Sequence, residues 1–128
     1  LYHGMQALRY DGVKDSIILA ATKPYDKRIA DWLDPVLAAA RDHKDWVAQA
    51  VNLMMMGADW PHLKAVIEKH KDLIIRHLLQ EYKSILDSND WVAVKLSNLA
   101  GRLHLIGQAG YDWPELGTIE KSIEAGHR

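Results

Sequence analysis

The chain has 128 residues, of which 48% are hydrophobic and 26% are charged, and it contains no cysteine. This composition is typical of a globular protein, and it excludes disulfide frameworks, thiolate nucleophiles, zinc fingers and iron–sulfur clusters. Sixteen Lys and Arg against seventeen Asp and Glu give a net charge of −1, which is not the basic balance expected of a protein that binds a polyanion.

A chain of this length buries roughly two-thirds of its unfolded surface in one core, so we expect a single domain over residues 1–128. The helical spacing of its apolar residues, described below, makes this an all-α domain. The longest unbroken apolar run, residues 17–21, is far shorter than the roughly 20 residues of a membrane span, so we expect no membrane contact. The sequence does not begin with Met, which suggests that the chain is processed or is part of a longer protein. The absence of cysteine and of a signal-peptide pattern favours a cytoplasmic protein.

Apolar residues recur at helical spacing along the chain, and no segment alternates with the period of a strand. Two helices are expected near the N-terminus, separated by Asp11-Gly12 and ended by Lys23-Pro24. In chain order the predicted helices span residues 2–10, 13–22, 32–43, 46–56, 60–87, 91–108 and 113–125.

Each of the five tryptophans directly follows an aspartate. Aspartate is a preferred N-cap because its carboxylate accepts hydrogen bonds from the unpaired amides of the first helical turn. We therefore expect each aspartate to cap a helix and each tryptophan to be its first residue. The pairs are Asp31-Trp32, Asp45-Trp46, Asp59-Trp60, Asp90-Trp91 and Asp112-Trp113.

Four of these pairs stand in segments that recur. The sequence Asp-Trp-Val-Ala occurs at 45–48 and again at 90–93, and Asp-Trp-Pro occurs at 59–61 and at 112–114. The recurrence favours imperfect helical-hairpin repeats over 45–87 and 90–128, of a length found in HEAT and armadillo units. Two architectures stay open: a short HEAT/armadillo-like array of antiparallel helical hairpins, or an irregular helical bundle.

Helix 46–56 is apolar nearly all round, so we expect it to be central. Trp46 and Trp91 begin helices of this apolar kind, and we expect both indole rings to be buried. Three consecutive methionines, Met54 to Met56, point in three directions around a helix and are expected to fill the core rather than to form a binding stripe.

A candidate interaction surface is suggested by two other features. On helix 60–87, three apolar residues widen the apolar arc beyond what a surface helix needs, and two tryptophans lie at Asp-Trp-Pro corners, where hairpin ends leave surface available. The candidate residues are Trp60, Trp113, Ile75, Leu79 and Leu86.

His70, His77 and Glu81 share one face of helix 60–87. The two histidines are two turns apart, roughly 10 Å along the axis, whereas helical metal ligands normally lie three or four residues apart. We therefore predict no metal and no cofactor, and expect a solvated helix flank.

Residues 49–68 fit the outline of a DNA-binding helix-turn-helix, with Gly57 in the turn. The side chains that would face the groove include Asp59, Lys64 and Glu68, a poor set for contacting phosphates or bases. Nucleic-acid binding is therefore the second hypothesis for function.

Catalytic signatures are missing from the sequence. It contains no Gly-x-Ser-x-Gly, phosphate-binding loop, His-Glu-x-x-His or Glu-x-x-Glu, and we assign no catalytic residue. The sequence favours a non-catalytic protein–protein interaction or adaptor module whose partner is another protein or a second copy of the chain.

Overall fold

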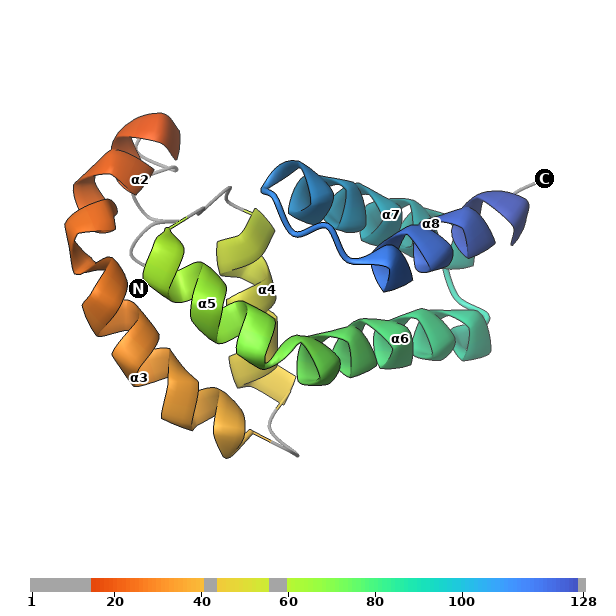
Figure 1. The fold of residues 1–128 in the computed structure, drawn as a ribbon. Helices are drawn as coiled ribbons and strands as arrows, with labels where there is room; N and C mark the ends of the chain where they lie inside the picture. The colour runs from red at the N-terminus through yellow and green to blue at the C-terminus, as the bar shows by residue number, and fades with distance from the viewer. Residues whose placement is uncertain (1–14, 41–43, 56–59, 127–128) are drawn as a thin grey trace.

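The computed structural model describes residues 15–40, 44–55 and 60–126, and these ranges consist of helices joined by short connections, with no strand among them (Figure 1). This confirms the all-α prediction, while the predicted helix 2–10 lies outside the described residues. The elements are α2 (Asp15–Thr22), the 3-10 turn η1 (Lys23–Tyr25), α3 (Asp26–Ala38), α4 (Lys44–Met55), α5 (Pro61–Lys69), α6 (Lys71–Ser88), α7 (Val92–Gln108) and α8 (Pro114–Gly126).

The helices follow one another across the molecule, with α2 and α3 at one side, α4 and α5 in the middle, and α6, α7 and α8 at the other side (Figure 1). Helix α5 packs on α3, α8 packs on α7 and α6, and α4 contacts α3, α6 and α7. Within the described residues, α5 and α8 thus have different main partners, although the sequence places them in equivalent repeat positions. The hairpin repeat stays a prediction.

The buried apolar side chains form one cluster that extends from Ile18 in α2 to Ile123 in α8. Helix α4 contributes most of one face to it, including Val51 and the fully buried Met54, which confirms that this helix is central and that Met54 fills the core. No helix in the described part of the chain is long and apolar enough to cross a lipid bilayer.

Helix α3 begins six residues earlier than predicted. Pro24 lies in the η1 turn, α3 follows from Asp26, and Asp31-Trp32 lies in the interior of α3 rather than at its start. The expectation that Asp31 is an N-cap is therefore wrong. Because Trp32 is an interior helical residue, it shares a face with residues one and two turns before it.

The predicted helix 60–87 is broken at His70, which has φ −103° and ψ 23°. The residues around the break include no proline or glycine, so local propensity gives no reason for it. The break allows α5 to pack on α3 while α6 packs on α4, α7 and α8. Tertiary packing overrides local sequence at this point, which is why the prediction of one continuous helix was wrong.

In two Asp-Trp pairs the tryptophan is the N-cap residue of the helix that follows. Trp91, not Asp90, is the N-cap of α7, and within the described residues no side-chain hydrogen bond caps that helix. Trp60 is likewise the N-cap of α5, in the extended conformation (φ −66°, ψ 130°) that a residue before proline favours. Asp59 lies outside the described residues.

The backbone amides in the first turn of α5 donate hydrogen bonds to a carboxylate of a different helix, α3. Asp26, at the start of α3, accepts hydrogen bonds from the backbone N–H groups of His62 (2.9 Å) and Leu63 (2.8 Å). Its side chain is buried, with 6% of the residue exposed. A carboxylate at a helix N-terminus satisfies unpaired donors and interacts favourably with the helix dipole. This contact therefore joins α3 to α5 by the chemistry of an N-cap, across 36 residues of sequence.

Replacing Asp26 with Ala should lower the free energy of unfolding by about 1–3 kcal/mol, because two amides lose a buried, charged acceptor. Urea denaturation checks this. Asp31→Ala on the same helix is the matched control, since Asp31 is exposed and has no side-chain hydrogen bond within the described residues. Equal denaturation midpoints for the two variants would contradict the inter-helix cap.

Candidate functional site

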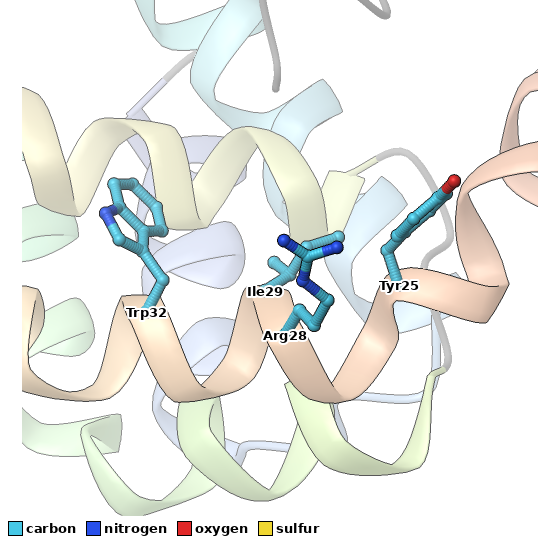
Figure 2. Close-up of a pocket in the computed structure, with 4 residues that line it drawn as sticks. All are labelled: Tyr25, Arg28, Ile29 and Trp32. Carbon is cyan, nitrogen blue, oxygen red and sulfur yellow. The ribbon is translucent and has the colours of Figure 1, made fainter.

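A groove of about 400 Å³ runs along one side of η1 and α3. Its lining among the described residues consists of Tyr25, Arg28, Ile29 and Trp32, whose side chains rise from the same side of this segment (Figure 2). Tyr25 and Trp32 are 52% and 46% exposed, while the half-buried Ile29 packs against the core and forms the floor. The result is an open groove with an aromatic ring at each end and a guanidinium between them.

A second tryptophan contacts Trp32, the aromatic residue at one end of the groove. Trp46, in the first turn of α4, lies edge-on to Trp32 with ring centroids 5.5 Å apart and planes at 72°. It is 37% exposed. Edge-to-face packing fixes the orientation of both rings, so the Trp32 ring is held by a neighbour although it is half exposed.

The charge near the groove is predominantly positive. Lys23, Lys27 and Arg28 are exposed, and none of them forms an ion pair within the described part of the chain. Asp31 is the one exposed acid of residues 23–32, because Asp26 is buried where it contacts α5, and Asp34 further along α3 is occupied at the α5–α6 junction. A ligand that carries negative charge would therefore meet unpaired cations here.

On the opposite face of α3, Asp34 attaches the C-terminal half of this helix to the junction of α5 and α6. The His70 ring donates from Nε2 to Asp34 Oδ1 at 2.7 Å, and the Lys69 ammonium lies 3.0 Å from Oδ2. These two contacts, the His70 hydrogen bond first and the Lys69 hydrogen bond second, lower the pKa of Asp34 below its usual value. Together with the Asp26 cap they attach both ends of α3 to α5 and leave the aromatic face outward.

A second, more polar groove of about 370 Å³ lies between α4, α6 and α7. Glu81 of α6 and Arg102 of α7 pair across it, so its principal charges neutralise each other. The remaining lining combines small, apolar and neutral polar side chains with a histidine. Its residues are Ala48, His77, Gln80, Glu81, Ser84, Ile85 and Arg102.

Three of the five predicted surface residues are not available at the surface. Trp60, Trp113 and Ile75 are 1%, 5% and 7% exposed and belong to the core cluster. Trp113 is buried with its indole N–H donating to Glu68 Oε2 at 2.9 Å and its ring edge-on to Tyr111. The Asp-Trp-Pro corners thus insert their tryptophans into the core.

Leu79 and Leu86 are exposed on α6, 37% and 44% respectively, and they remain candidates for an interaction surface. The expectation for Trp46 and Trp91 was wrong, because both are exposed, Trp91 at 73%. Trp91 precedes α7 in the left-handed conformation (φ 52°), outside the helix whose apolar face enters the core.

His70, His77 and Glu81 do not form a shared site. His70 contacts Asp34 at the helix break, whereas His77 and Glu81 line the groove between α4, α6 and α7. In the described ranges, no group of three or more His, Asp or Glu side chains is arranged to hold a metal ion.

Sequence reasoning missed the groove on α3. Tyr25, Arg28 and Trp32 are spaced three and four residues apart, which places them on one helical face. That spacing is the signal, but it is visible only if residues 25–32 are taken as helical. The predicted cap at Asp31 divided this segment between a loop and a helix.

Comparisons with protein-family models, curated proteins and solved structures find no match to this chain. The function is therefore argued from the geometry of the site.

Replacing Asp34 with Asn tests the second attachment of α3. A carboxylate with a lowered folded-state pKa stabilises the fold above its unfolded pKa of about 4, and this stabilisation is lost as the pH falls through the folded pKa. The thermal midpoint of Asp34→Asn should therefore lie below that of the unmodified chain at about pH 6, and the gap should narrow at about pH 3.

Asp31→Asn is the control for this measurement, because the exposed Asp31 carboxylate has no hydrogen bond to a side chain among the described residues. A gap for Asp34→Asn that stays constant across the acid range would show that ionisation of Asp34 does not contribute.

Proposed function

We propose that this chain is a protein–protein interaction module that binds a segment of a partner protein in the groove along α3. The observation that carries the proposal is the exposure of Tyr25, Arg28 and Trp32 side by side in one groove. Tyrosine, arginine and tryptophan are the residue types most enriched among the side chains that dominate binding energy at protein interfaces.

The rigidity of the groove supports the same proposal. Helix α3 is attached to α5 through Asp26 and Asp34, and the Trp32 ring is oriented by Trp46. A preformed surface loses little conformational entropy when it binds, so more of the contact energy appears as affinity.

The helix-turn-helix alternative is less favoured, since it requires a free face on α5. Trp60 is buried, Glu68 accepts a hydrogen bond from Trp113, and the Lys64 ammonium lies 5.7 Å from the centre of the Tyr111 ring. Trp60, Lys64 and Glu68 are therefore engaged within the protein.

Selection from a displayed library of random peptides tests the proposal, with the immobilised full chain as bait. We expect peptides that bind the unmodified chain and bind Trp32→Ala at least about tenfold more weakly, since truncation of a central aromatic anchor commonly has this effect.

Trp91→Ala is the matched control, because Trp91 is an exposed tryptophan on a different part of the molecule. Circular dichroism establishes that both variants are folded. Selected peptides that bind all three proteins equally, or a selection that enriches no sequence, would contradict the assignment of the groove as the binding site.

A further inference from the structure

The spacing of the two aromatic rings limits the conformation of a bound segment. Tyr25 and Trp32 are seven residues apart, which corresponds to about 10 Å along the helix axis, and Arg28 lies between them. In a polyproline II helix, which rises about 3.1 Å per residue with three residues per turn, every third side chain lies on the same side, at intervals of about 9 Å. A segment in this conformation therefore presents two residues three apart at the spacing of the two rings.

The chemistry of the lining agrees with such a segment. Proline rings pack against aromatic faces, and grooves lined by aromatic side chains are a recurring way of binding polyproline II segments. The conformation exists before binding, so little entropy is lost when the segment docks. Figure 2 shows the Tyr25 and Trp32 rings standing apart with the Arg28 and Ile29 side chains between them, as walls and floor for such a chain.

The unpaired cations near the groove favour a bound segment with negative charge. Arg28 lies between the two rings, and Lys23 and Lys27 precede it along η1 and α3, all three exposed and without an ion pair in the described ranges. These three cations outnumber the one exposed acid of residues 23–32, Asp31. The two residues between the prolines project about 120° to either side of the proline face, so an acidic side chain there meets the long Arg28 side chain at the edge of the groove. Acidic residues outside the prolines can interact with the lysines.

A helical partner with apolar residues seven apart would match the same spacing along its axis, but it fits the charges less well. Helices pack by interlocking rows of side chains at an interaxial distance of about 8–10 Å, which would enclose Arg28 in the seam between them. An extended chain leaves one side of the guanidinium in water, so the charge is not fully desolvated.

We infer that the groove on α3 binds an acidic, proline-containing segment of another protein in the polyproline II conformation, with one proline against Tyr25, one against Trp32 and an acidic side chain paired with Arg28. This inference rests on the proposed function and specifies its ligand.

Titration of the ¹⁵N-labelled full chain with synthetic peptides tests the inference. The probe is a short peptide with two prolines three residues apart and glutamates between and beside them. We expect the indole N–H signals of Trp32 and Trp46 to shift on titration while that of Trp91 stays unchanged. A peptide of the same composition with adjacent prolines, and one with lysines in place of the glutamates, should each bind at least about tenfold more weakly.

Reversing the charge of Arg28 distinguishes a specific ion pair between Arg28 and the peptide from general electrostatic attraction. Arg28→Glu should weaken binding of the acidic peptide and strengthen binding of the lysine peptide, whereas Arg76→Glu, an exposed arginine on α6, should change neither by a comparable factor. The same result for both variants would overturn the role of Arg28.

The remaining outcomes distinguish this inference from the proposed function. If a helical peptide with leucines seven residues apart and the same glutamates binds as tightly as the proline peptide, the polyproline II assignment is overturned. If library selection yields Trp32-dependent peptides but the acidic proline peptide does not bind, this inference fails while the proposed function stands. If no peptide depends on Trp32, both fail.

Discussion

The arrangement of α3 and α5 depends on the hydrogen bonds that the buried Asp26 carboxylate accepts. This carboxylate accepts hydrogen bonds from two amides in the first turn of α5, which have no backbone acceptor there, and it belongs to a residue in the first turn of α3. Separating the two helices would leave a buried carboxylate and two backbone amides without hydrogen-bond partners, which costs free energy. The starts of α3 and α5 are therefore held together. Asp34, bonded to His70 and Lys69, repeats the attachment two turns later, at the junction of α5 and α6.

The groove is a consequence of these two attachments. The side of α3 that carries Asp26 and Asp34 faces α5, together with the buried Leu33 and Leu37. Tyr25, Arg28 and Trp32 are therefore left on the outer side, where α4 supplies Trp46 as a lateral support. Two exposed aromatic rings would be a liability in a protein without a partner, since exposed apolar patches promote association. Their placement around an unpaired arginine is instead consistent with a specific binding surface.

The sequence predicted the helical class, the central position of α4 and the approximate extents of α7 and α8, because each of these depends on apolar periodicity over many residues. It did not predict features that depend on contacts between distant residues. The break at His70 has no local cause and accompanies contacts to α3, and the cap of α5 comes from Asp26 rather than from the preceding aspartate. The groove was missed for the same reason: with Asp31 taken as a cap, the one-sided spacing of Tyr25, Arg28 and Trp32 was not recognised.

The central claim is that Asp26 caps α5 from another helix, and amide hydrogen exchange tests it most directly. First-turn amides of a helix normally exchange quickly because they have no intrahelical acceptor. We expect the amides of His62 and Leu63 to be protected to a degree close to the interior of α5. The amides of Ala93 and Val94, in the first turn of α7, should exchange quickly, because no side chain of the described residues caps that helix. Equally rapid exchange at all four amides would contradict this claim.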